Sequence, residues 1–180
     1  MNFDRKDGGA MVLHPEDYQM KIPYPAVKTA GPNIAYARMM LRNIGSRNSE
    51  TSSCMLYLYD RAVTTAYPEI SNVFEQIMHT EEIHLDLFSQ AAFQLGADPR
   101  AWYVPGGRAQ YWSPAALRYT TVLRPLLQNA LALERATIAE YELQIQKTQD
   151  EGLLQLLRRV LLDESMHVEI FRSLIASYNA

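Results

Sequence analysis

The chain has 180 residues, of which 48% are hydrophobic and 21% are charged, and its formal net charge is −3. This composition is typical of a globular protein, and the length suits one domain with a substantial core rather than two. A net charge of −3 offers no basic surface for nucleic acid, and no apolar run is long enough to span a membrane. We therefore expect a cytoplasmic protein that binds neither nucleic acid nor a membrane.

The first part of the chain is predicted to be an arm followed by a helix. Residues 1–32 contain four of the nine prolines. Because proline fixes φ and removes a backbone donor, we expect an extended N-terminal arm there and a separate helical domain over 33–180. Residues 33–66 are predicted to form the first helix, with Gly45 and the polar run 46–49 as the point where it would break or kink.

Three further helices are predicted, separated by one long connection. The second helix covers residues 68–95 and the third and fourth cover 122–149 and 152–177, each bounded by proline, glycine or polar residues. Residues 96–120 are rich in glycine and proline and are expected to be irregular, with one short helix after Ser113. The predicted fold is therefore all-α, a four-helix bundle with one long crossover between the second and third helices.

One constellation of four residues occurs twice. Each copy has a glutamate, a tyrosine seven residues later, and then a Glu-x-x-His motif. Matching residues are separated by 84, 84, 83 and 83 positions: Glu50, Tyr57, Glu81 and His84 in the first half, and Glu134, Tyr141, Glu164 and His167 in the second. This is the set of side chains with which a helical bundle holds two metal ions.

Helical periodicity directs both Glu-x-x-His motifs into the core. They lie on the apolar stripes of the second and fourth helices, and with a rise of roughly 1.5 Å per residue all the acidic and imidazole groups reach a similar depth. Four carboxylates in an apolar bundle repel one another and lose their hydration unless cations neutralise them. We therefore predict two metal ions per chain, with these ligands: Glu50, Glu81, His84, Glu134, Glu164 and His167.

The pattern resembles the ferritin-like di-metal carboxylate superfamily, which includes manganese catalases, rubrerythrins and bacterioferritins. The resemblance covers nearly the whole helical domain and implies a ferritin-like bundle. It also implies that Glu50 and Glu134 are ligands from the first and third helices, that Glu81 bridges the two metals and that each imidazole binds one ion. Asp163 stands before the second Glu-x-x-His motif and would be the partner of a ligating imidazole.

Three side chains are candidate catalytic residues, each with two interpretations. Tyr57 and Tyr141 would either hydrogen-bond to the cluster or act only as core aromatics. Glu164 corresponds to a second bridge in rubrerythrin-like and bacterioferritin-like sites. In manganese catalases the corresponding residue stands off the metals and can transfer protons.

The expected function is redox chemistry with hydrogen peroxide or dioxygen at two Mn or Fe ions. Disproportionation of peroxide needs no partner, whereas its reduction needs an external electron donor, since a single cysteine, Cys54, cannot build an iron–sulfur module. A ferroxidase or iron-handling protein is one alternative, and a coat or assembly protein that retains a metal site is another. We also expect a homo-oligomer, at least a dimer.

Overall fold

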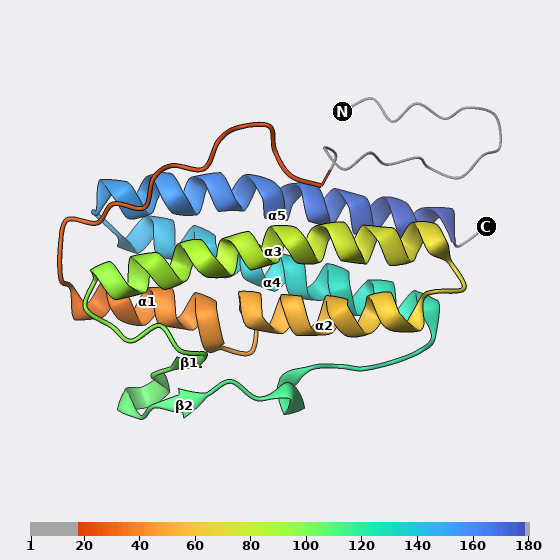
Figure 1. Ribbon diagram of the computed structural model, residues 1–180, viewed down its shortest axis with the longest axis horizontal. Coiled ribbons are helices and arrows are strands. Elements are labelled where there is room, and N and C mark those ends of the chain that lie inside the picture. Colours follow the sequence, from red (N-terminus) through yellow and green to blue (C-terminus); the bar gives the residue numbers. More distant parts are fainter. Residues whose placement is uncertain (1–17, 179–180) are drawn as a thin grey trace.

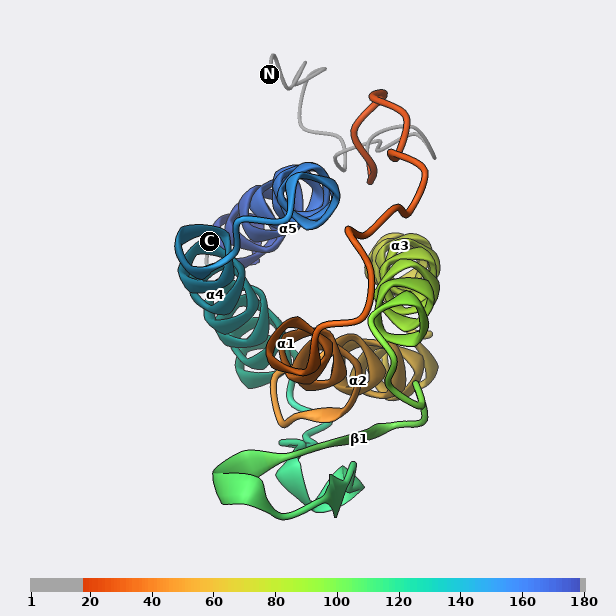
Figure 2. The same cartoon turned by 90° about the vertical axis from the view of Figure 1, so that its left-hand side faces the viewer.

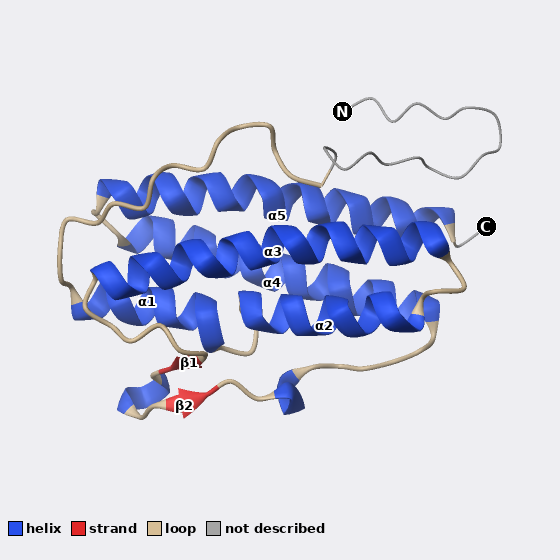
Figure 3. Ribbon diagram, in the orientation of Figure 1, coloured by secondary structure: helices blue, strands red, loops and turns tan. Residues whose placement is uncertain are grey.

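A computed structural model describes residues 18–178 of the chain as a bundle of long helices (Figure 1, Figure 3). Its helices are α1 Ile34–Gly45, α2 Glu50–Val63, α3 Pro68–Gln94, α4 Leu123–Lys147 and α5 Glu151–Ser177. Helices α1 and α2 follow one another along one edge, so the four members of the bundle are α1 with α2, α3, α4 and α5. The predicted all-α four-helix bundle is confirmed. Within residues 18–178, no helix is both long and apolar enough to cross a bilayer.

The first predicted helix breaks at the expected point. A Cβ atom on Gly45 would lie 2.3 Å from the backbone nitrogen of Trp102, so only glycine lets the crossover pass this closely. The chain then restarts as α2, whose N-cap residue Ser49 accepts a hydrogen bond from the Ser52 amide. This restart makes Glu50 the first residue of α2 and directs its carboxylate into the core.

The connection between α3 and α4 is largely irregular, as predicted. Short 3-10 turns, η2 Pro105–Gly107 and η3 Pro114–Ala116, interrupt it, and the second follows Ser113 as expected. Two strands that were not predicted, β1 Trp102–Tyr103 and β2 Gln110–Tyr111, pair antiparallel. Strands of two residues are too short to produce a recognisable alternation in the sequence.

Residues 18–33 form no helix or strand and lie over the seam between α3 and α5 (Figure 2). Gln94 at the end of α3 anchors this segment, because its side chain accepts from the Thr29 amide at 3.1 Å and donates to the Val27 carbonyl at 2.9 Å. Residues 1–17 of the predicted arm lie outside the described residues.

The core consists of two apolar clusters with a polar layer between them. One cluster surrounds Phe74 and Phe171, and the other surrounds Phe88 and Leu157. The residues predicted to line the inward stripes of α3 and α5 are buried, including the Glu and His of both motifs. Charged side chains therefore occupy the middle of an otherwise apolar bundle.

Candidate metal centre

Six acidic and imidazole side chains meet in the middle of the bundle, each at most 1% exposed. They form two overlapping groups, in each of which one ligand atom per residue lies within 4.8 Å of the others. The groups are Glu50, Glu81, His84 and Glu164, and Glu81, Glu134, Glu164 and His167. The structure thus brings together all six side chains singled out as candidate ligands, and two glutamates belong to both groups.

The two shared glutamates each contact both imidazoles through different oxygens. Glu81 Oε2 lies 3.2 Å from His84 Nδ1, and Glu81 Oε1 lies 2.9 Å from His167 Nδ1. Glu164 Oε1 lies 3.1 Å from His84 Nδ1, and Glu164 Oε2 lies 3.5 Å from His167 Nδ1. A carboxylate with one oxygen toward each imidazole has the arrangement needed to bridge two ions.

Both repeated tyrosines donate hydrogen bonds to cluster carboxylates, and both bonds cross between the halves of the chain. The Tyr57 hydroxyl donates to Glu134, and the Tyr141 hydroxyl donates to Glu50. Burial, followed by the charge of the accepting glutamate, raises the pKa of each tyrosine well above its usual range, so both remain protonated donors. Each ring also packs against core aromatics, so the two interpretations of these residues hold together.

The outer nitrogens of the two imidazoles have different partners. His84 Nε2 lies 3.1 Å from Asp163 Oδ2 on α5. His167 Nε2 lies 3.0 Å from the backbone carbonyl of Tyr18, which belongs to the segment before α1. Both Nδ1 atoms are thereby turned toward the carboxylates.

Arg159 and Tyr24 hold the Asp163 carboxylate in place. Arg159 Nη1 lies 2.7 Å from Asp163 Oδ2, and the Tyr24 hydroxyl donates to the same oxygen at 2.7 Å. Burial acts to raise the pKa of Asp163, but His84 and these contacts outweigh it and lower the pKa to about 2. Sequence reasoning singled out Asp163 but missed Tyr18, Tyr24 and Arg159; the i, i+4 spacing of Arg159 and Asp163 is the one signal that could have found a member of this network.

The carboxylates differ in their affinity for protons. Burial, followed by the charges of Glu81 and Glu164, raises the pKa of Glu50 well above its usual range, and burial with the charge of Glu164 raises the pKa of Glu134 to about 7. Burial also favours the neutral forms of Glu81 and Glu164, but the two imidazoles outweigh it and lower their pKa values. The cluster thus has two outer glutamates with raised pKa values and two central ones with lowered pKa values.

The donor atoms of the cluster fit metal ions. Glu50 Oε2 and Glu134 Oε2 are buried and make no hydrogen bond to any residue in the described range, and the two oxygens of Glu164 face only the imidazole nitrogens. Leaving such oxygens buried without a partner costs several kcal/mol. A set of carboxylates and imidazoles accepts manganese, iron or zinc, so the cluster could hold a metal.

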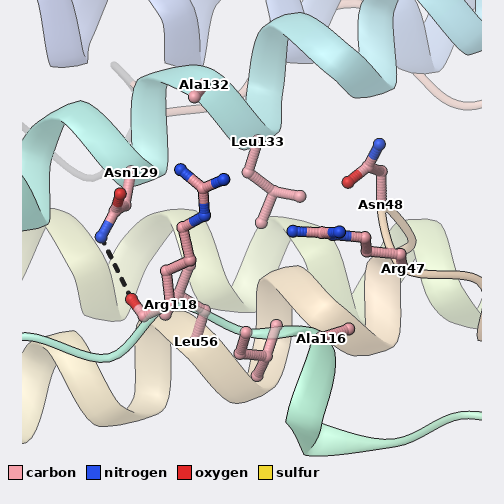
Figure 4. Close-up of a pocket in the computed structure, with 9 residues that line it drawn as sticks. Arg47, Asn48, Leu56, Ala116, Arg118, Asn129, Ala132 and Leu133 are labelled. Atoms are coloured by element: carbon pink, nitrogen blue, oxygen red, sulfur yellow. Dashed lines mark hydrogen bonds between the residues drawn. The ribbon is translucent and has the colours of Figure 1, made fainter.

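A pocket of about 450 Å³ lies between α2, α4 and the crossover (Figure 4). Leu56 and Leu133 are the buried residues of its lining, 3% and 9% exposed. In the sequence they directly precede Tyr57 and Glu134. The guanidinium groups of Arg47 and Arg118 flank the pocket and have no ion-pair partner between residues 18 and 178. Asn129 donates to the Arg118 carbonyl at 3.1 Å and holds the crossover against α4.

Comparison with known proteins supports this description. The family model of rubrerythrin matches residues 46–175 of the chain. Two crystal structures of KatB, a manganese catalase from Anabaena, one of the wild type and one from Anabaena PCC7120, each match with a TM-score of 0.79 and 20% identity over 94% of this chain and 81% of the other. No curated protein matches. These structural matches confirm the predicted ferritin-like fold.

Proposed function

Because the chain belongs to the rubrerythrin family, we propose that it is an oxidoreductase that binds two ions of manganese or iron and reduces hydrogen peroxide. The proposed ligands are the six buried side chains of the cluster. The four glutamates would carry a charge equal and opposite to that of two divalent ions, so bound metal would offset the burial and the mutual repulsion that now favour protons on Glu50 and Glu134.

The position of Glu164 is the observation that favours peroxide reduction over disproportionation. Its two oxygens face the two imidazoles in the same way as those of Glu81, which supports a pair of bridging carboxylates. A bridging Glu164 resembles the rubrerythrin-like arrangement rather than that of manganese catalases, where this carboxylate stands apart as a base. We therefore favour reduction of peroxide with an external electron donor over disproportionation.

The protein groups have separate roles in this proposal. A pair of metal ions bound here would supply the two electrons that reduce a peroxide to water. Tyr57 and Tyr141 would fix the outer glutamates through their hydrogen bonds. Glu134, whose pKa is about 7 in the metal-free cluster, would give up its proton when it binds a metal ion as a carboxylate.

Disproportionation is the second candidate, and the cysteine count favours it. A chain with only Cys54 has no cysteine set for an iron–sulfur electron donor, so its electrons would come either from another protein or from a second peroxide. The solved structures to which the chain is similar in fold are named manganese catalases, and a catalase takes its electrons from a second peroxide.

The test combines metal analysis with oxygen measurement. Protein from its native host should contain about two metal ions per chain by elemental analysis, and His84→Ala should lose at least half of them. His79→Ala is the matched control, because His79 is exposed on the same helix and pairs with Glu82 outside the cluster. Fewer than one ion per chain in the native protein, or an unchanged content in His84→Ala, would refute the site.

Addition of peroxide to the metal-loaded protein separates the candidate functions. Turnover only in the presence of a reductant supports peroxide reduction, and oxygen release without a reductant supports disproportionation. Oxidation of Fe²⁺ in preference to peroxide turnover would favour a ferroxidase or iron-handling protein, and inactivity in all assays would favour a coat or assembly role. We further propose a homo-oligomer, at least a dimer, for which light scattering after gel filtration is the direct test.

A further inference from the structure

The segment 18–24 approaches both imidazoles from outside the helices. The Tyr18 carbonyl lies 3.0 Å from His167 Nε2, and the Tyr24 hydroxyl lies 3.2 Å from His84 Nε2. Tyr18 is only 2% exposed, so this part of the arm is built into the core. A non-helical segment distant in sequence from both Glu-x-x-His motifs thus completes the surroundings of their histidines.

Arg159 on α5 ties this segment to the bundle. Its Nε donates to the Ile22 carbonyl at 2.6 Å, and its Nη2 donates to the Met20 carbonyl at 2.8 Å. Its guanidinium carbon lies 4.2 Å from the centre of the Tyr24 ring, in cation–π geometry. The Met20 amide donates to Asp163 Oδ1 at 2.7 Å. Since Arg159 is 5% exposed, these bonds form largely away from water, where each is costly to break.

The contacts of the segment select one tautomer of each imidazole. A backbone carbonyl can only accept, so the bond to Tyr18 requires hydrogen on His167 Nε2. Asp163 Oδ2 is likewise an acceptor for His84 Nε2 and receives the Tyr24 hydroxyl at the same time. Nδ1 of each imidazole faces the shared carboxylates. When Nδ1 gives up its hydrogen, an imidazole that keeps hydrogen on Nε2 presents its lone pair at Nδ1, where a metal ion would bind.

The repeat explains why the segment is needed. The offset of 83 positions pairs Asp163 with Thr80, so the first half of the chain has no acid at the place from which one could reach His167. The Tyr18 carbonyl occupies that role, and Thr80 Oγ1 itself lies 3.5 Å from this carbonyl. The arm thus supplies to His167 the acceptor that Asp163 supplies to His84.

From these contacts we propose that residues 18–24 form a strap that positions both histidines, so that docking of the strap and binding of metal are coupled. Tyr24 and Arg159 are positioning residues in this proposal, and the proposal rests on the metal site of the proposed function. Because coupling is reciprocal, whatever loosens the strap must weaken metal binding, and metal must stabilise the docked strap by the same factor.

The test compares Tyr24→Phe with the full-length wild type. The variant keeps the ring over Arg159 but loses the hydroxyl that orients Asp163, and we expect its affinity for Zn²⁺, measured by competition with a chelator, to fall about 10- to 100-fold. Tyr36→Phe is the matched control: its hydroxyl accepts from the Gln149 amide at 3.0 Å, remote from the cluster, and its affinity should not change.

Hydrogen exchange provides a readout that a purely structural role would not move. In the wild type, Zn²⁺ should slow exchange of the Met20 amide by at least tenfold, and this slowing should be smaller in Tyr24→Phe. Equal affinity in the variant and the wild type, or exchange of residues 18–24 that ignores Zn²⁺, overturns the strap alone. A wild type that binds no Zn²⁺ and no Mn²⁺ overturns the proposed function and the strap with it.

Discussion

Replacing Asp60 with asparagine tests how strongly burial governs the charges of this bundle. Asp60 lies on α2 one turn beyond Tyr57, is 1% exposed, and its Oδ2 has no hydrogen-bond partner in the part of the chain that the structure describes. Burial raises its pKa from 3.8 to about 8. The folded chain therefore keeps a proton that the unfolded chain releases, and stability falls as the pH rises from about 4 to about 8.

The size of the effect follows from that shift. At about 1.4 kcal/mol per pKa unit, the raised pKa of Asp60 costs roughly 4 kcal/mol of folding free energy at pH 7 and between 1 and 2 kcal/mol at pH 5. Asp60→Asn keeps the shape of the side chain and removes the titration. We expect the variant to be more stable than the wild type by about these amounts, with the larger gain at the higher pH.

Urea unfolding of both proteins at pH 5, 6 and 7 measures this difference, and an unchanged m-value would show that the unfolded states are comparable. Other titrating groups affect both proteins equally and cancel in the comparison. Asp86→Asn is the control, because Asp86 is exposed on α3 and its change should alter stability by less than about 0.5 kcal/mol. A gain that is the same at pH 5 and pH 7, or a loss at both, would refute the account of Asp60.

Three further outcomes are expected at the site. Tyr141→Phe should weaken binding of Mn²⁺ about 10- to 100-fold in calorimetry, because Glu50 loses the donor that fixes it; an unchanged affinity would leave Tyr141 as a core aromatic only. Zn²⁺ binding should strengthen as the pH rises through 7 and release protons, since the pKa of Glu134 is about 7, and calorimetry in buffers of different ionisation enthalpy counts those protons. The pocket is lined by Leu56 and Leu133, the sequence neighbours of Tyr57 and Glu134, and is therefore a candidate entrance for peroxide; Ala132→Trp should fill it and slow peroxide turnover at constant metal content, and unchanged turnover would exclude this entrance.

The sequence was sufficient to predict the bundle and to find the six clustered side chains. Both depend on helical periodicity, and the second copy of the motif separated a site from a chance match. The shared position of Glu164 could not be read from spacing, because spacing gives the level of a carboxylate in the bundle but not the direction of its two oxygens. Asp60 is buried on α2 like Glu50, yet the absence of a partner for its Oδ2 among residues 18–178 depends on tertiary packing, which spacing does not reveal.

The strap could not be predicted because its contact to His167 comes from a backbone carbonyl. Every residue has such a carbonyl, so the bond from His167 to Tyr18 leaves no trace in residue type. The segment before α1 also has no period that would place its side chains on a face. Proline content predicted that it would be extended, and tertiary packing then decided where it lies.

The distribution of the six clustered side chains has a consequence for how the chain is organised. The hairpin of α2 and α3 supplies three of the four residues of the first group, and its Glu81 also belongs to the second group. The hairpin of α4 and α5 supplies three residues of the second group, and its Glu164 also belongs to the first. Neither hairpin holds a complete set, but two copies of either one related by a twofold axis would. The centre is therefore an interface between two similar half-chains, an internal dimer that the crossover has made permanent. The two halves differ in the partner of their histidine: His84 contacts Asp163, whereas His167 contacts the Tyr18 carbonyl of the strap.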